Sequence, residues 1–346
     1  MLTAVVNNNA IIVNNTELPS IGDAEILVKM HSCGICGSDL EKVFGAYYMK
    51  SSRIGHEPAG DVVRIGSKVK TINTGERVFV HHHVSCHACR ICLEGDYTMC
   101  DMYQNSNIEP CGLSEYFIVP ERNISNGGVL KLPLSVSFDE AALIEPLACC
   151  LRGINKVSIR HGYIVAIFGA GPTGLMHAML AERQGAAKVI LIDFNDFRLN
   201  FAKRHNDIII MNSSVQKDIV NEINKLTDNI GVDATILATG NMNALTQALK
   251  ITRRGGRILL FGVPSSKNGI ELDLSRLYSN EHLIIPSYGA SEIETNQALY
   301  LIYDKSVNLN YLITHRFNLR DANSAFQCAH AALDSMKVII VSRPVF

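Results

Sequence analysis

The chain has 346 residues, 47% of them hydrophobic and 19% charged, with 32 Lys and Arg against 33 Asp and Glu. This length predicts about two domains, and the apolar fraction excludes a disordered or fibrous chain. The near-zero net charge argues against a nucleic acid or a membrane as a partner. Because the N-terminus lacks a signal-peptide pattern and no apolar run could span a bilayer, we expect a cytoplasmic protein.

The sequence changes character near residue 150. Before this point short apolar runs alternate with Gly, Asn and Pro, which predicts a mostly antiparallel β domain. After it strand and helix patterns alternate, which predicts a parallel sheet covered on both faces. From about residue 289 we expect the chain to return to the first domain. The predicted domains are therefore 1–150 with 289–346, and 151–288.

The elements of the second domain are predicted from their apolar periodicity. The expected strands are Tyr163–Phe168, Lys188–Asp193, Ile208–Met211, Asp233–Ala238, Arg257–Val263 and His282–Tyr288. The expected helices are Thr173–Gln184, Asp196–His205, Val215–Thr227 and Asn243–Thr252. In the C-terminal segment we expect a helical stretch, a short strand pair and the end strand Lys337–Ser342.

A glycine-rich turn follows the first of these strands and opens the first helix. Its pattern G-x-G-x-x-G comprises Gly169, Gly171, Pro172, Thr173 and Gly174. Here the first glycine allows the tight turn, the second lets a pyrophosphate approach, and the third lets the helix pack on the strand. The helix N-terminus adds free N–H groups for the phosphates. The turn therefore predicts a dinucleotide site; an ordinary strand-turn-helix is the alternative.

An acidic residue ends the next strand at the position that selects between dinucleotides. Asp193 lies about twenty residues beyond the glycines, where a carboxylate binds the 2′-hydroxyl of the adenosine ribose. A carboxylate repels the 2′-phosphate of NADP, so NAD is favoured and NADP is less favoured. Arg198 is able to accommodate that phosphate, but beside Asp193 we interpret it as a cover for the ribose.

Four cysteines lie within one short loop. Cys86, Cys89, Cys92 and Cys100 supply four thiolates, which close a tetrahedral zinc and leave no position for substrate. We therefore predict a structural zinc in a lobe at about 84–103. An iron–sulfur cluster or free thiols are the alternatives. A nucleic-acid zinc ribbon would need basic and aromatic neighbours, and this stretch has few.

A second, open metal site is indicated by residues from three parts of the chain. Cys36 lies between two expected strands, His56 and Glu57 follow some twenty residues later, and Glu145 precedes the second domain. Cys, His and one or two carboxylates form an incomplete zinc shell with a position for water or substrate. His56 alone would more often be structural, but the combination with a nucleotide fold predicts a catalytic metal.

At this point the sequence resembles a known family. The runs CGICGSD (33–39) and GHEPAG (55–60), the four-cysteine loop and the GAGPTG turn resemble zinc-dependent medium-chain alcohol dehydrogenases over essentially the whole chain. Glu57 and the segment around Glu145 resemble the sorbitol and polyol branch. The resemblance implies a Rossmann-type doubly wound parallel sheet, plus a mostly β GroES-like catalytic domain with a structural zinc lobe.

The resemblance also assigns roles at the open site. Cys36 and His56 would ligate the catalytic zinc, and Glu57 and Glu145 would complete its shell directly or through water. Asp39 matches the acid that hydrogen-bonds the ligand histidine. The resemblance thus implies two zinc ions per chain, one catalytic and one structural.

Further matches concern the substrate and the nicotinamide. Ser38 matches the hydroxyl that touches the substrate oxygen and begins a proton path. Many relatives have a histidine three residues later, where this chain has Glu41, so that relay is in doubt. His82 and His83 occupy pocket positions, unless they belong to a solvated loop. The segment that includes Gly262 and Val263 would run beside the nicotinamide.

The function implied is oxidation of a secondary hydroxyl of a polyol or sugar, or a sugar phosphate, to a ketone with hydride transfer to NAD. L-threonine 3-dehydrogenase is the nearest alternative, and a non-catalytic zinc- and nucleotide-binding protein is the alternative from another class. We expect a homotetramer or a homodimer, with the active site in the cleft between the domains. The remaining cysteines are interpreted as reduced packing residues: Cys33, Cys111, Cys149, Cys150 and Cys328.

Overall fold

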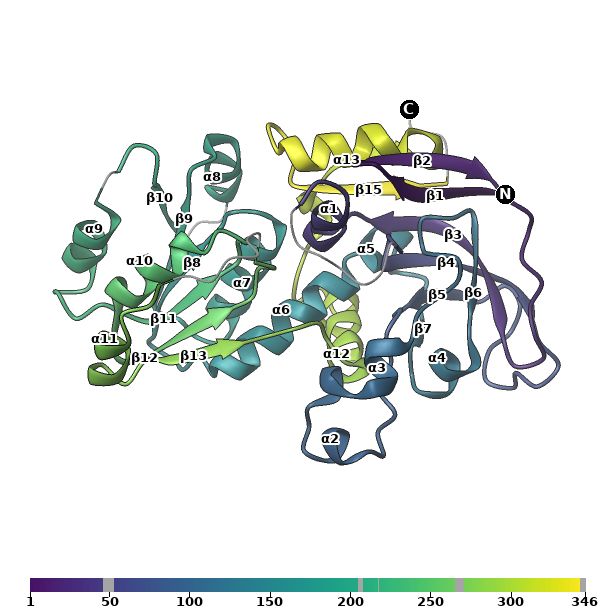
Figure 1. Ribbon diagram of the computed structural model, residues 1–346, viewed down its shortest axis with the longest axis horizontal. Helices are drawn as coiled ribbons and strands as arrows, with labels where there is room; N and C mark the ends of the chain where they lie inside the picture. The colour runs from purple at the N-terminus through teal and green to yellow at the C-terminus, as the bar shows by residue number, and fades with distance from the viewer. Residues whose placement is uncertain (46–52, 205–207, 217, 265–270, 343–346) are drawn as a thin grey trace. The chain divides into compact units, whose positions relative to one another are not determined.

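The computed structural model describes residues 1–45, 53–204, 208–216, 218–264 and 271–342. The chain forms two compact units. One comprises Met1–Ala148 and Gly289–Phe346, and the other comprises Cys149–Tyr288. Helix α6 (Ile144–Val157) leads from the first into the second. Both units are rich in strands and helices, and the expected mixed α/β fold class is confirmed (Figure 1).

The first unit is built on a seven-stranded sheet in the order β14-β15-β3-β4-β5-β7, with β6 paired to β3. All its pairings are antiparallel except that of β14 with β15. A separate hairpin joins β1 to β2. The strands are β1 (Leu2–Asn7), β2 (Ala10–Asn15), β3 (Ile26–Gly34), β4 (Glu57–Ile65), β5 (Arg77–Val80), β6 (Tyr116–Val119), β7 (Val129–Lys131), β14 (Ile313–Asn318) and β15 (Lys337–Val341).

Short helices connect these strands and cover the sheet. They are α1 (Gly37–Val43), α2 (Arg90–Leu93), α3 (Asp101–Asn105), α4 (Glu121–Ser125), α5 (Phe138–Ala141), α12 (Glu292–Tyr303) and α13 (Ala322–Ala331), with 3-10 turns η1 (Tyr97–Met99), η2 (Asn310–Leu312) and η3 (Leu319–Asp321). The core is apolar and includes Val28, Met30, Phe117, Phe326 and Ile340. Because Phe326 and Ile340 pack with residues of β3, the C-terminal segment is part of this core.

The second unit contains a six-stranded, fully parallel sheet in the order β10-β9-β8-β11-β12-β13. In chain order this is the 3-2-1-4-5-6 arrangement of a dinucleotide-binding fold. The strands are β8 (Ile164–Phe168), β9 (Lys188–Asp193), β10 (Ile208–Asn212), β11 (Val232–Leu237), β12 (Thr252–Leu260) and β13 (Leu283–Pro286). The helices are α7 (Pro172–Arg183), α8 (Asp196–Ala202), α9 (Ile219–Leu226), α10 (Asn243–Ile251) and α11 (Leu274–Ser279).

Most elements agree with their predicted ranges, although residues 205 and 217 of two expected helices lie outside the described residues. β12 begins at Thr252 rather than Arg257, because a bulge between these residues lets the strand continue past Gly255 and Gly256. Helices α11 and α13 were not predicted. In the C-terminal segment the described residues contain β14 alone before the end strand, so the expected short strand pair was wrong.

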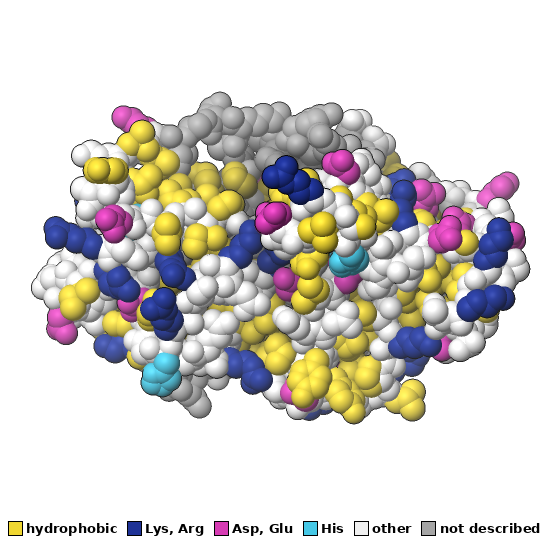
Figure 2. Space-filling view, turned by 90° about the horizontal axis from the view of Figure 1, so that it is seen from below, with side chains coloured by type: hydrophobic (Ala, Val, Ile, Leu, Met, Phe, Trp, Pro, Cys, Tyr) yellow, Lys and Arg dark blue, Asp and Glu magenta, His cyan; other side chains and the backbone are white. Residues whose placement is uncertain are grey.

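On the face drawn in Figure 2, Lys and Arg side chains are interspersed with Asp and Glu rather than gathered by sign. Across the described residues, no helix combines the length and apolar character required to cross a membrane.

Candidate functional site

The open site lies where strands β3, β4 and β15 meet. β3 runs antiparallel to both neighbours, so its end lies beside the first residues of β4 and β15. Cys36 follows β3, and His56 immediately precedes β4, which begins at Glu57. Antiparallel register therefore brings residues some twenty positions apart to one point.

Three ligand atoms converge there. One atom from each of Cys36, His56 and Glu57 lies within 4.8 Å of the other two. A thiolate sulfur, an imidazole nitrogen and a carboxylate oxygen are all zinc ligands, and three protein ligands leave the fourth tetrahedral position open. The donor set therefore fits the catalytic type of zinc site.

Asp39 holds the histidine of this cluster. Its Oδ1 lies 3.3 Å from Nδ1 of His56, and its carboxylate also accepts the backbone N–H groups of Cys36 and Gly55. Burial would raise the pKa of Asp39, but the charge and hydrogen bond of His56, helped by Lys42, lower it to about 2. Because Asp39 engages Nδ1, Nε2 of His56 is left for a metal.

Glu57 has a cationic partner that the sequence analysis missed. Lys337 Nζ donates to Oε1 of Glu57 at 2.7 Å and lies 2.5 Å from Oε2. Both side chains are buried, and Gly34 leaves the space for them, since a Cβ there would lie 1.7 Å from Glu57 Oε2. Burial would lower the pKa of Lys337, but the charges of Glu57 and Cys36 raise it. The sequence showed only a lysine at the start of an apolar end strand, which by itself does not point to a partner.

Glu145 lies near this pair without joining the three-residue cluster. It is in the first turn of α6, 6% exposed, and its charge raises the pKa of both Glu57 and Lys337. Burial is the larger influence on Glu57, whose pKa is raised despite Lys337. The fourth expected ligand thus acts on the cluster electrostatically in this structure.

Ser38 and Glu41, which stands where many relatives have a relay histidine, both lie on α1. Ser38 is partly buried, two residues after Cys36. The side chain of Glu41 lies against Gly45, just past the end of α1. A Cβ on Gly45 would be only 1.9 Å from Glu41 Oε2. Burial raises the pKa of Glu41, while the charge of His330 lowers it.

The histidine run after β5 lies beside the metal cluster. The ring of His82 is centred 5.1 Å from that of His56 and 3.9 Å from that of His83. Nδ1 of His83 lies 2.7 Å from the Ser106 carbonyl oxygen. Burial is the main influence on all three rings. It lowers the pKa of His81 to about 3, that of His83 to about 4, and that of His82 well below its usual value, so they are neutral near pH 7.

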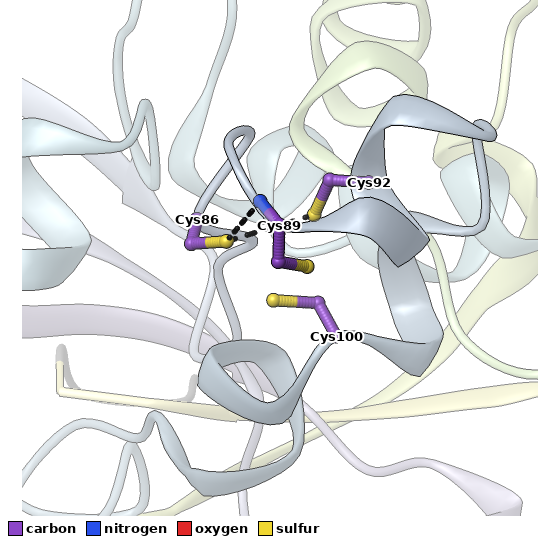
Figure 3. Close-up of side chains that lie close together, drawn as sticks. All are labelled: Cys86, Cys89, Cys92 and Cys100. Carbon is purple, nitrogen blue, oxygen red and sulfur yellow. Dashed lines mark hydrogen bonds between the residues drawn. The ribbon is translucent and has the colours of Figure 1, made fainter.

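The four-cysteine loop forms a separate closed cluster (Figure 3). The sulfurs of Cys86, Cys89, Cys92 and Cys100 lie within 4.8 Å of one another, and that of Cys86 is 3.9 Å from that of Cys92. Two thiolates on a tetrahedral zinc, each at about 2.3 Å, would be about 3.8 Å apart. Backbone N–H groups of Ala88 and Cys89 lower the pKa of Cys86 to about 6, which favours the thiolate. The geometry fits a zinc with four sulfur ligands.

The lobe around these cysteines has little other core. Its buried cluster consists of Cys92, Cys100 and Tyr103, with Cys86 and Cys89 among the partly buried residues packed on it. Its attachment is polar: Glu292 of α12 accepts the backbone N–H of Ser85 at 2.7 Å.

The glycine turn of the second unit has the geometry that a pyrophosphate needs. Gly169 has φ +106°, which favours glycine, and a Cβ on Gly174 would lie 1.8 Å from the Gly169 carbonyl oxygen. A Cβ on Gly171 would meet only Arg198, at 3.3 Å, so the turn is open there. Pro172 is the first residue of α7, where its missing N–H costs no hydrogen bond.

Asp193 ties this turn to the following strand. Its Oδ2 accepts the Ala170 N–H at 2.6 Å, and its Oδ1 accepts the N–H groups of Phe194 and Asn195. Arg198 lies close by; burial lowers its pKa, while the charge of Asp193 raises it. Gly262 packs against the backbone of Thr239, and Val263 follows it beyond the end of β12.

Comparisons with known proteins match two parts of the chain to dehydrogenase domains. Residues 22–133 match the alcohol dehydrogenase GroES-like domain, and residues 172–303 match the zinc-binding dehydrogenase domain. Sorbitol dehydrogenase of Bacillus subtilis (strain 168) is 32% identical over 95% of this chain and 93% of its own. L-threonine 3-dehydrogenase of Vibrio vulnificus (strain CMCP6) is 30% identical over 93% of each chain.

Among solved structures, a Sinorhizobium meliloti 1021 protein bound to NADP has a TM-score of 0.84 and 26% identity, with 99% of each chain covered. The fold, the two family domains and the full-length relatives agree. The chain therefore belongs to the zinc-dependent medium-chain alcohol dehydrogenase family, in its sorbitol and polyol branch, and is an oxidoreductase acting on polyols or alcohols.

Proposed function

We propose that the chain oxidises a secondary hydroxyl of a polyol or sugar to a ketone, with NAD as the hydride acceptor. The observation that carries this proposal is the open cluster of Cys36, His56 and Glu57, held by Asp39. A zinc held there would act as a Lewis acid on a hydroxyl oxygen, and a nicotinamide would accept the hydride. The first unit would be the catalytic domain and the second the NAD-binding domain.

The chain's own residues prepare that chemistry in three ways. Asp39 fixes the tautomer of His56, so that Nε2 points its lone pair at the metal position. Lys337 compensates the charge of Glu57, which allows a buried carboxylate to remain beside the thiolate of Cys36. Ser38, on the first turn of α1, would accept the substrate's hydroxyl proton. Glu145 would approach the metal through water, since it lies outside the three-residue cluster.

The substrate preference rests on the pocket histidines. His82 lies against His56, and a neutral imidazole both donates and accepts hydrogen bonds, which suits a ligand with several hydroxyls. L-threonine 3-dehydrogenase is retained as an alternative because one such relative is 30% identical over almost the full chain. The segment Ala148–Cys150 differs from the Gly-Asn-Ala usual in threonine dehydrogenases, which favours the polyol reading.

The cofactor proposal is NAD with two zinc ions per chain, one in each cysteine-containing cluster. We favour NAD because the carboxylate of Asp193, beside the glycine turn, would repel the 2′-phosphate of NADP. The similar Sinorhizobium meliloti protein has NADP bound, so the preference needs its own test. We further propose a homotetramer or homodimer in the cytoplasm.

The substrate is tested first. With NAD present, kcat/KM for sorbitol-like polyols should exceed that for L-threonine by at least about tenfold, because a site built for several hydroxyls loses hydrogen bonds with the amino acid. A spectrophotometric screen over polyols, sugars, sugar phosphates and amino alcohols measures this ratio. Turnover of threonine alone would exclude the polyol assignment.

The two zinc sites should respond differently to loss of one ligand. Cys36→Ser should lower kcat/KM by more than about 100-fold with little change in Tm, since an open site contributes little to the fold. Cys89→Ser should lower Tm by roughly 5 °C or more, because the lobe has little core besides its cysteines. Equal losses of Tm in thermal unfolding would contradict this division of roles.

Replacing Lys337 should lower the free energy of unfolding, because its partner Glu57 loses its cation. Lys337→Met leaves Glu57 buried without a cation, which should lower the free energy of unfolding by about 3–5 kcal/mol. Lys305→Met is the matched control: its pair with Glu140 at 3.2 Å involves a lysine side chain 58% exposed, so it should cost less than about 1 kcal/mol. Denaturant unfolding measures both.

The double variant Lys337→Met with Glu57→Gln separates charge from packing. It should recover part of the stability lost by Lys337→Met alone, because the uncompensated carboxylate is gone. No recovery would mean that Lys337 acts through packing rather than by neutralising Glu57.

The role of Asp193 is tested by an isosteric change. Asp193→Asn should raise the KM for NAD and lower the NAD-to-NADP ratio of kcat/KM by about tenfold, since the amide no longer repels a phosphate. Asp196→Asn, three residues further on, is the control; the Asp196 carboxylate accepts from the side-chain amide of Asn212 at 2.6 Å. Steady-state kinetics with both cofactors gives the ratio; an unchanged ratio would remove Asp193 from cofactor selection.

A further inference from the structure

A third cluster of metal-binding side chains lies in the first unit, apart from the two zinc sites described above. One ligand atom each from His315, Cys328 and Asp334 lies within 4.8 Å of the other two. Within the described residues, three groups of His, Cys, Asp or Glu satisfy this distance relation, and the other two are the open cluster and the four-cysteine cluster. The third group therefore satisfies the same distance relation as the two clusters at which the family implies zinc.

The three side chains come from separate segments that pack together. His315 lies on β14, Cys328 on the last turn of α13, and Asp334 in the turn that leads into β15. α13 packs against both β14 and β15, and Figure 1 shows it running along β15. The convergence thus results from tertiary packing and not from neighbours on one loop.

Hydrogen bonds position the imidazole of His315. Thr314 Oγ1 accepts the Met336 N–H at 2.9 Å and lies 3.5 Å from the Lys337 carbonyl oxygen, and Nδ1 of His315 lies 3.0 Å from the same Oγ1. Nε2, the other ring nitrogen, faces Asp334, 4.0 Å from Oδ1. A neutral ring with its proton on Nδ1 offers the Nε2 lone pair to a metal.

The other two ligands are also placed for a cation. Cys328 is partly buried, and the Ser335 hydroxyl donates to its carbonyl oxygen at 3.1 Å, which fixes the turn carrying Asp334 on the end of α13. Asp334 is 74% exposed, so an ion has a path from solvent. Burial raises the pKa of Cys328, a hydrogen bond from Ser335 lowers it, and the charge of Asp334 raises it, so a bound metal would have to displace the thiol proton.

We propose that His315, Cys328 and Asp334 form a third zinc site with one open coordination position. Imidazole nitrogen, thiolate and carboxylate are each zinc ligands, and hard cations such as Mg²⁺ would not select a set containing a thiolate. Bound zinc would join β14, α13 and the turn before Lys337, the residue that pairs with Glu57. The proposal does not depend on the substrate or on the cofactor preference.

The test uses Co²⁺ as a spectroscopic probe on chain loaded with two zinc ions, so that the open and four-cysteine clusters are filled and the third is free for Co²⁺. Added Co²⁺ should give a thiolate-to-cobalt charge-transfer band in the wild type that is absent in Cys328→Ser, and wild-type chains should bind one more Co²⁺ than the variant at equilibrium dialysis. Asp334→Asn, at an exposed turn position, should keep the fold and weaken Co²⁺ binding at least about tenfold, since one charged ligand is lost.

His330→Gln provides the matched control, since it lies two residues from Cys328 on α13 with its ring 4.4 Å from Phe44 and outside the cluster. It should retain the band and the extra Co²⁺. Equal uptake and equal spectra in wild type, Cys328→Ser and Asp334→Asn would overturn the proposal, whatever substrate the enzyme uses. If the band survives in Cys328→Ser but disappears in Cys36→Ser, the band belongs to the open cluster, and the proposal is again overturned.

Discussion

The ion pair between Glu57 and Lys337 is the interaction on which the open site depends. Taking two charges out of water costs several kcal/mol per ion, and only close geometry offsets this. Here both carboxylate oxygens lie within ion-pair distance of one ammonium group, and the lysine also faces the thiolate of Cys36. Without that cation, two anionic ligands and Glu145 would repel one another in a buried space.

The pair in turn sets requirements on the backbone. Gly34 lies directly opposite Glu57 in the β3–β4 register, and any side chain there would occupy the position of the carboxylate. Lys337 begins β15, which pairs with β3 on its other side. One glycine and two strand pairings thus fix where Cys36, His56 and Glu57 lie, while the hydrogen bond to Asp39 fixes the orientation of the His56 ring.

In the four-cysteine lobe the cysteines themselves supply most of the core. A zinc bound there would therefore contribute more to the stability of the fold than one at the open cluster.

Much of this could be predicted from local sequence. The glycine turn, the four-cysteine loop and the strand–helix alternation are short-range signals whose physical reason lies within about thirty residues, and the family confirmed the fold that they indicated. Lys337 could not be found in this way, because it is 280 residues from Glu57 and a single lysine in an apolar strand has no local pattern. The same holds for Cys328, which was interpreted as a packing residue. It does pack on the core, yet it also lies beside His315 and Asp334.

These long-range contacts explain why the first unit is discontinuous in sequence. The segment after Gly289 supplies Glu292, which attaches the cysteine lobe, and Lys337, which neutralises the carboxylate of the open cluster. It also supplies β15, without which β3 would present an unpaired edge beside the metal ligands. The open cluster and the four-cysteine cluster are formed by residues before position 101, and each has a buried charged contact with a residue among the last sixty. The return of the chain therefore supplies side chains to the surroundings of both clusters as well as strands to the sheet.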